Sequence, residues 1–299
     1  MPTGIFTNAN LPPTDVEFCV ASDFHIGADE SNFRNTLNST RQDYVFANNK
    51  IQSALSAEAH TLKRFCQKIL YSGKLGMFED GRHKLVLLGD IINGECGYFA
   101  SYKSIAYRML LGSVLPWIYT GNIIYVCGNH DKEAKFYTNL TGFQRGSIFE
   151  DTYTDMGVKF SHGHKFDPLC DGKTAIGLMG DLASEFVTNL CSPALEDLFR
   201  GREFYEVHDR SNLKRIAESE SISRLSQSDR MLMKAALNDA RNSDGCHTAI
   251  CGHTHQKPMW YNSGQMNYIN TGKFARDGFL NVVVRRDSEL EICRLVSVG

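Results

Sequence analysis

The chain carries at residues 123–131 the sequence IIYVCGNHD, in which a short apolar run leads directly into Gly128, Asn129, His130 and Asp131. A run of this length and composition predicts a strand that is buried on both faces. In open α/β sheets, ligands bind beyond the carboxyl ends of the strands. We therefore expect the polar residues of this stretch to lie at a functional edge of a sheet.

Four other stretches repeat this pattern of a short apolar strand followed by a polar turn. They are residues 16–27 (VEFCVASDFHIG), 84–90 (KLVLLGD), 158–164 (VKFSHGH) and 248–255 (TAICGHTH). Carboxylate, amide and imidazole ligands together suit Mn, Fe, Zn or Co. Two such ions about 3.5–4 Å apart can hold a phosphoryl group together with the oxygen that attacks it. The turns therefore predict a site for two divalent metal ions.

The segments between these strands indicate helices. Apolar residues recur on one helical face within residues 55–70, and a second helix is expected around residues 101–118, interrupted by Pro116. Strands that alternate with helices predict an α/β fold. Terminal strands are expected at residues 266–270, 279–285 and 290–296.

Two stretches break this alternation. Residues 28–53 are rich in Asn, Ser and Thr and predict an inserted loop. Residues 170–245 predict a mostly helical insertion or cap, with helices at 175–191 and roughly 222–241. We expect one domain over residues 1–299, with the insertion at 170–245 inside it.

The composition limits the kind of protein. Of the 299 residues, 42% are hydrophobic, which is enough for a substantial core, and the formal net charge is −2. A chain with this charge balance gives no sign of the basic surface that binding of long nucleic acids requires. Nine cysteines without a CxxC pair indicate a reducing compartment. Without a signal peptide or a transmembrane segment, the sequence predicts a cytoplasmic protein, and it leaves the oligomeric state open.

The order of the motifs resembles that of the calcineurin-like metallophosphoesterases. That family carries D-x-H, G-D, G-N-H-D, H-G-H and G-H-x-H in this order, and all five are present between residues 16 and 272. The resemblance implies two packed mixed β-sheets flanked by helices, an α/β sandwich with the ligands at one edge. It also implies a helical insertion that shapes the pocket.

Within the superfamily, the chain resembles most the subfamily of UDP-diacylglucosamine diphosphatase and its relatives. The similar stretches are residues 22–27, 162–167, 252–258 and 268–272, together with the helical insertion. Three positions depart from the pattern. His164 stands where the relatives have Asp, Pro258 comes one residue late, and His130 replaces the Arg of the diphosphatase. The last departure leaves the substrate open.

The resemblance implies a role for each residue of the motifs. It places metal ligands at Asp23, His25, Asp90, Asn129, His162, His253 and His255. Asp23, His25 and His255 would hold the first ion, and Asn129, His162 and His253 the second, with Asp90 as the bridge. His130 would face the substrate and either protonate the leaving oxygen or stabilise charge on the phosphoryl group, and Asp131 would orient His130. Manganese is the first expectation for both ions, with iron, zinc and cobalt as alternatives.

The predicted function is hydrolysis of a phosphate ester or pyrophosphate by a metal-bridging hydroxide, with a small phosphorylated or nucleotide-like substrate. A nuclease or cyclic-nucleotide phosphodiesterase is the first alternative, because DNA-repair nucleases of the superfamily share G-N-H-D and H-G-H. A non-catalytic scaffold is the second alternative. For His164, two interpretations stay open: a neighbour that supports the metal ligands, or a solvated loop residue.

Overall fold

The computed structural model describes residues 16–24, 59–60, 62–67, 70, 84–92, 100–134, 148–167, 203–207, 225–254, 258–272, 279–286 and 288–298. The predicted ligands His25 and His255 lie outside these residues, as do the predicted loop at 28–53 and the predicted helix at 175–191. Among the described helices, none is both long and apolar enough to cross a membrane. The six described cysteines are present as thiols, five of them buried.

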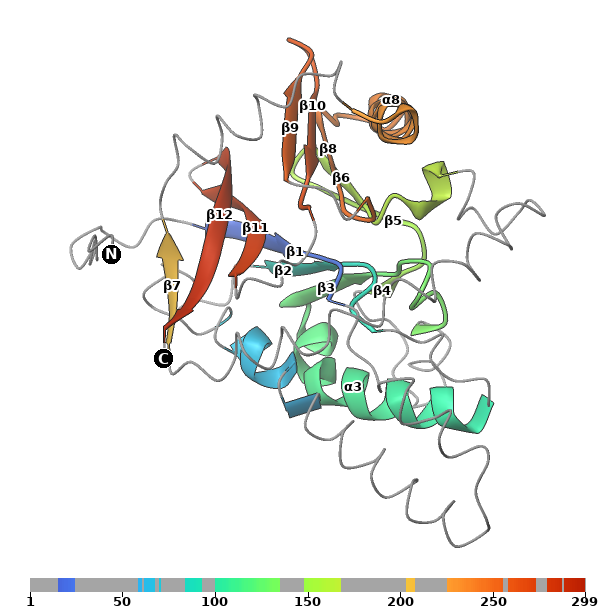
Figure 1. The fold of residues 1–299 in the computed structure, drawn as a ribbon, viewed down its shortest axis with the longest axis vertical. Coiled ribbons are helices and arrows are strands. Elements are labelled where there is room, and N and C mark those ends of the chain that lie inside the picture. The colour runs from blue at the N-terminus through green and yellow to red at the C-terminus, as the bar shows by residue number, and fades with distance from the viewer. Residues whose placement is uncertain are drawn as a thin grey trace, which may run out of the picture.

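The larger of two sheets has the strand order β4-β3-β2-β1-β11-β12-β7 (Figure 1). Its strands are β1 (Val16–Ala21), β2 (Lys84–Leu88), β3 (Ile123–Val126), β4 (Ile148–Phe149), β7 (Glu203–Val207), β11 (Phe279–Arg286) and β12 (Glu289–Val298). The first four run parallel, whereas β11, β12 and β7 pair antiparallel. Because the four parallel strands end at one edge, the turns that follow β1, β2 and β3 meet there.

The smaller sheet has the order β5-β6-β8-β10-β9. Its strands are β5 (Thr152–Asp155), β6 (Val158–Ser161), β8 (Thr248–Cys251), β9 (Met259–Asn262) and β10 (Asn267–Asn270). The central strands β6, β8 and β10 are parallel, and β5 and β9 pair antiparallel at the two edges. The turns after β6 and β8 therefore also share one edge.

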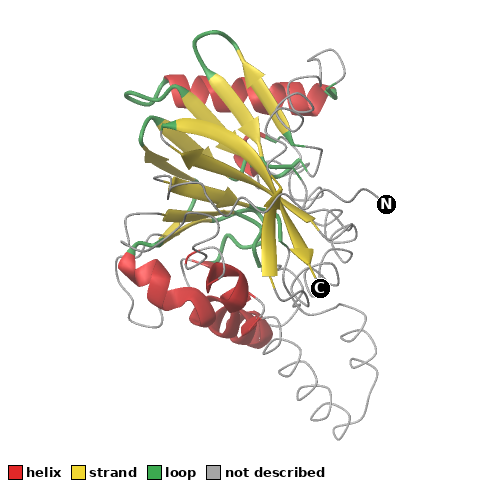
Figure 2. Ribbon diagram, turned by 90° about the vertical axis from the view of Figure 1, so that its left-hand side faces the viewer, coloured by secondary structure: helices red, strands yellow, loops and turns green. Residues whose placement is uncertain are grey.

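The two sheets pack face to face, with helices on the outer faces (Figure 2). Alternate residues of the central strands explain this layering. Phe18, Val86 and Ile124 pack between the sheets against Phe160 and Ile250. The residues between them in sequence point to the other face of the larger sheet, where they meet the helices. The predicted fold class, an α/β sandwich of two mixed sheets flanked by helices, is confirmed.

Helix α3 (Ala100–Thr120) covers the outer face of the larger sheet and runs without a break through Pro116. The expected interruption at this proline is therefore wrong. Pro116 has no N–H, so the helix loses the hydrogen bond to the carbonyl of Gly112. Pro116 is exposed and lies in the last turns, where a local distortion does not disturb the core. Val114 and Ile118 on either side of it are buried in the core, and this burial holds the final turn in place.

Helix α8 (Gln227–Arg241) covers the outer face of the smaller sheet. Ser226 caps its N-terminus, because the Ser226 hydroxyl accepts a hydrogen bond from the Asp229 N–H at 3.1 Å. This helix agrees with the one expected at roughly 222–241. Strand β7, by contrast, lies within the stretch for which the sequence predicts mostly helix. It pairs with β12 at the edge of the larger sheet.

Candidate metal centre

The carboxyl ends of β1, β2, β6 and β8 meet where the edges of the two sheets adjoin, and predicted ligands follow each of these strands. Three of them, Asp23, Asp90 and His253, have positive φ angles of 58°, 52° and 72°. A non-glycine residue in this region carries a backbone strain of about 1–3 kcal/mol, and such residues concentrate at functional sites. This backbone conformation directs each side chain away from the line of its strand and into the junction between the sheets.

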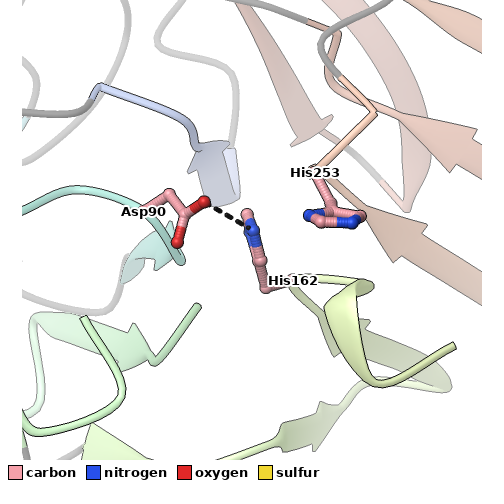
Figure 3. A group of neighbouring side chains, drawn as sticks. All are labelled: Asp90, His162 and His253. Carbon is pink, nitrogen blue, oxygen red and sulfur yellow. Dashed lines mark ion pairs between the residues drawn. The ribbon is translucent and has the colours of Figure 1, made fainter. Parts of the chain in front are cut away.

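Asp90, His162 and His253 form a compact group at this junction (Figure 3). One possible ligand atom from each residue lies within 4.8 Å of the others. Asp90 follows β2 of the larger sheet, whereas His162 and His253 follow β6 and β8 of the smaller one. Oδ2 of Asp90 lies 3.0 Å from Nε2 of His162. A carboxylate and two imidazoles at this spacing are a ligand set for a borderline divalent ion.

The orientation of His162 is set by the strand that carries Asp90. Its Nδ1 lies 3.0 Å from the carbonyl oxygen of Leu88, the last residue of β2. That contact leaves Nε2 directed towards Asp90. The side chain of His162 has no exposed surface. A hydrogen bond to the outer nitrogen is the usual means by which proteins orient a metal-binding histidine.

Asp23 joins the two sheets at the same point. Its carboxylate accepts hydrogen bonds from the hydroxyl of Ser22 and from the backbone N–H of His253, the latter at 3.1 and 3.2 Å. The Asp23 N–H in turn donates to the carbonyl of Gly89 at 3.1 Å. Ser22 also contacts the hydroxyl of Thr271 at 2.6 Å. Asp23 is thereby held beside the turns that carry Asp90 and His253.

The Asn-His-Asp turn after β3 wraps around the Asp90 carboxylate. The His130 N–H donates to Asp90 Oδ1 at 3.0 Å, and His130 Nε2 lies 4.0 Å from Asp90 Oδ2. Asn129, His130 and Asp131 are all buried. The carboxylate of Asp131 accepts from the Ile91 N–H at 2.9 Å and from the hydroxyl of Tyr125 at 2.5 Å. Asp131 thus ties the turn after β2 to the strand that precedes its own turn.

Negative charge dominates this junction. Burial alone would lower the pKa of His162. The charge of Asp90 and its hydrogen bond with His162 outweigh burial, and the charges of Asp23 and Asp131 act in the same direction. The pKa of His162 is therefore raised to about 10. Burial, followed by the charge of Asp90, raises the pKa of Asp131 to about 6. Both shifts have the direction expected where buried carboxylates lie close together.

The residues at the junction fit divalent metal ions. The side-chain oxygen of Asn129 is buried without a hydrogen-bond partner among the described residues. Its neighbours on both sides, Gly128 and His130, lie against Asp90. A buried acceptor without a donor costs free energy unless a cation or another group satisfies it. Clustered carboxylates, oriented imidazoles and an amide oxygen are donors that such an ion takes.

His164 lies beside this group. It is half-buried, and its ring centroid is 5.5 Å from that of His162. Burial, and next the charge of His162, lowers the pKa of His164 to about 3. The position favours the interpretation of His164 as a neighbour of the ligands over that of a solvated residue.

Two further residues at the junction have no predicted role in the sequence. Asn270 donates from its side chain to the carbonyl of Gly252 at 2.8 Å and so supports the turn that carries His253. Asp167 contacts His253 directly, with 3.2 Å between Oδ2 and Nε2. Both residues lie inside stretches that carry the family resemblance, and this was the only signal of them in the sequence.

Comparison with known proteins adds little to this description. No family model matches the sequence, and no curated protein matches it either. Among solved structures, the chain is similar to a dimetal phosphatase from Danio rerio, with 13% sequence identity and a TM-score of 0.35. That match covers 94% of this chain and 98% of the other. A likeness at this level supports neither a fold nor a function.

Proposed function

We propose that the protein is a metal-dependent phosphoesterase that hydrolyses a phosphate ester or pyrophosphate. The observation that carries this proposal is the convergence of Asp90, His162 and His253 from both sheets within 4.8 Å. The order of the five motifs supports it, since each motif follows a strand and the turns after all five strands reach the junction that holds the group.

In this proposal the motif residues hold two divalent ions, for which manganese is the preferred identity. The described ligands are Asp23, Asp90, Asn129, His162 and His253, and His25 and His255 complete the set. When bound, such ions lower the pKa of water and neutralise the charge of a phosphoryl group. Asp90 would be the shared ligand, because it lies next to Gly89, which accepts from the Asp23 N–H, and its carboxylate is 3.0 Å from His162.

His130 is the proposed proton donor. Its ring is buried beside Asp90 and is not needed as a ligand. In this role Nε2 transfers a proton to the leaving oxygen, which avoids the release of an alkoxide. Asp131 remains the proposed orienting group for His130. Its hydrogen bonds to Ile91, Tyr125 and Gly128 would act by fixing the turn on which His130 lies.

A substrate panel with Mn²⁺-loaded protein tests the proposal. The panel contains aryl phosphate mono- and diesters, nucleoside diphosphate sugars, cyclic nucleotides and short DNA. We expect turnover of a small phosphorylated or nucleotide-like substrate that is lost in Asp90→Ala and falls about 10²–10⁴-fold in His130→Ala. His60→Ala, at an exposed histidine, is the matched control and should retain full activity.

The panel also separates the alternatives. Hydrolysis confined to short DNA or cyclic nucleotides would replace the proposal by the nuclease or phosphodiesterase alternative. Stoichiometric metal binding without turnover of any member would contradict the enzyme proposal and favour a scaffold.

A further inference from the structure

A short turn after β6 brings a carboxylate to the candidate centre that is not among the proposed ligands. The turn is η2 (His164–Phe166), and Asp167 directly follows it. Two backbone hydrogen bonds close the turn: the Phe166 N–H donates to Gly163 at 2.9 Å, and the Asp167 N–H donates to His164 at 3.0 Å. The position of Asp167 is therefore fixed relative to β6.

The turn passes close to His253, which follows a different strand. Gly163 adopts φ 112°, and a β-carbon at this position would lie 3.4 Å from the β-carbon of His253. The carboxylate of Asp167 contacts the imidazole of His253 at Nε2, which lies 3.2 Å from Oδ2. The two side chains are mostly shielded from solvent, with 18% and 10% of their surface exposed. Asp167 and His253 are 86 residues apart in sequence.

This contact determines which nitrogen of His253 is available to a ligand. A neutral imidazole carries hydrogen on one ring nitrogen and a lone pair on the other. An ionised carboxylate only accepts hydrogen bonds, so the nitrogen that faces Asp167 must carry the hydrogen. Nδ1 of His253 is then left with the lone pair that a metal ion requires.

We propose that Asp167 is the positioning residue for His253. It accepts a hydrogen bond from Nε2 and so holds the ring with Nδ1 presented to a divalent cation at the site of Asp90 and His162. This inference deepens the proposed function and rests on its metal site. It names a residue that acts through a ligand and does not itself bind the ion.

The second imidazole of the group is held in a similar way. The outer nitrogen of His162 contacts the carbonyl oxygen of Leu88 at 3.0 Å. The rings of His162 and His253 cross at 74° with their centroids 5.1 Å apart. Each ring therefore has one nitrogen that faces an oxygen from outside the group of Asp90, His162 and His253. Partners of this kind typically change metal affinity by about 10–100-fold when they are removed.

The test compares Asp167→Ala and Asp167→Asn with the wild-type full-length chain. The dissociation constant for Mn²⁺ is measured by competition with a chelator. We expect Asp167→Ala to weaken the binding of one ion by about 10–100-fold. Asp167→Asn should weaken it by less, because the amide oxygen still accepts from Nε2. Asp155→Ala is the matched control. Asp155 lies on β5 beside the start of β6, whereas the candidate centre follows the end of β6, and its carboxylate pairs with Lys84. This variant should leave metal affinity unchanged.

A second measurement reports the position of the hydrogen itself. Nitrogen NMR of the histidine side chains in metal-free protein, kept in chelator, should show His253 with hydrogen on Nε2 in the wild type and in Asp167→Asn. Asp167→Ala should lose this preference. A role limited to folding would not change the tautomer. If Asp167→Ala fails to fold by circular dichroism, Asp167→Asn and the wild-type NMR spectrum still carry the test.

Two outcomes would overturn the inference. Wild-type metal affinity and an unchanged tautomer in Asp167→Ala would show that Asp167 does not position the ring. Equal loss of affinity in Asp167→Asn and Asp167→Ala would make Asp167 a ligand instead. The proposed function fails separately: a wild-type protein that binds two ions but hydrolyses no member of the panel would leave the role of Asp167 intact.

Discussion

Gly89, Gly128 and Gly252 each precede a predicted ligand, and each has a side chain from another turn packed against its α-carbon. A β-carbon at Gly89 would lie 2.5 Å from Cγ of His162, and one at Gly252 would lie 2.5 Å from Oδ2 of Asp23. At Gly128 the added atom would collide with the carboxylate of Asp90. Real β-carbons do not approach other atoms this closely, so the glycines of these motifs make room for the ligands of neighbouring turns.

Gly89→Ala should therefore disturb the site as well as the fold. We expect the free energy of unfolding to fall by about 2–4 kcal/mol, from strain at φ 75° and from the collision with His162. Gly264→Ala is the matched control, because Gly264 has φ 83° but nothing within 4 Å of the added atom. It should cost only about 1 kcal/mol. Equal losses in urea unfolding would contradict the proposed collision.

Asp131 provides a second prediction at single-residue scale. Its buried carboxylate accepts from Ile91, Tyr125 and Gly128, so the amide of Asp131→Asn must turn an N–H₂ group towards at least one donor. We expect a loss of about 2–4 kcal/mol in the free energy of unfolding. Tyr125→Phe removes only one donor and should cost less. A variant Asp131→Asn as stable as the wild type would show that these hydrogen bonds contribute little.

Secondary structure elements differed in how well the sequence predicted them. Strands β1, β2, β3 and β8 were predicted because most of their residues are buried on both faces, which leaves a nearly continuous apolar run, and β6 was predicted although Lys159 interrupts its run. The short strands β4, β5, β7 and β9 were not predicted. The described side chains of β4 and β5 are only partly buried or exposed, and edge strands of this kind lack a hydrophobic signature. The continuation of α3 past Pro116 depends on core contacts of Ile118, which local preference does not reveal.

The candidate site was partly predictable for a related reason. Motif order indicated Asp90, His162 and His253, and the structure brings these three residues together; their binding of metal stays a prediction. His25 and His255 lie outside the described residues. No sequence pattern indicated the contact of Asp167 with His253, because it depends on how two turns from different strands lie against each other.

At the scale of elements, a cluster of charges attaches α8 to the smaller sheet. Oδ2 of Asp239 on α8 lies 2.8 Å from Nζ of Lys159 on β6 and 3.1 Å from Nζ of Lys165 on η2. Burial alone would raise the pKa of Asp239, but the hydrogen bonds of the two lysines outweigh burial and lower the pKa below its ordinary value of 3.8.

A depressed pKa adds stability that is present above pH 3.8 and is lost as the pH falls through the folded value. In chelator, Asp239→Asn should therefore be less stable than the wild type at pH 7, by under about 1 kcal/mol because solvent screens the pair. The difference should shrink below pH 3.8. Asp151→Asn, at an exposed turn, is the control. A difference that stays constant down to pH 2 would contradict the charge contribution of Asp239.

At the scale of the whole molecule, the candidate centre connects the two sheets. Asp23 and Asp90 belong to the larger sheet, and His162 and His253 belong to the smaller one. An ion held by ligands from both sheets opposes their separation. A ligand that binds only the folded protein stabilises it by about 2.7 kcal/mol at a concentration 100 times its dissociation constant.

Metal removal should accordingly lower the thermal stability of the whole molecule. We expect Mn²⁺ to raise the unfolding temperature of the wild type and of His60→Ala, and a chelator to reverse the rise. Asp90→Ala should show no such response, since it removes the carboxylate shared by both sheets. Differential scanning calorimetry measures the shift. A full response in Asp90→Ala would place the bound ions elsewhere.

The pairing of β1 with β11 has a consequence for biosynthesis. The carboxylate of Glu17 on β1 accepts from the Ser288 N–H at 2.9 Å, across a separation of 271 residues. At a synthesis rate of about 5–20 residues per second, β1 is made roughly 14–54 s before this partner exists. During that interval β1 can pair with β2 on one side, but the edge of VEFCVA that β11 later covers has no partner, and open edges of this kind favour aggregation. The larger sheet, and with it the junction that holds the candidate centre, is completed only when translation reaches the last strands.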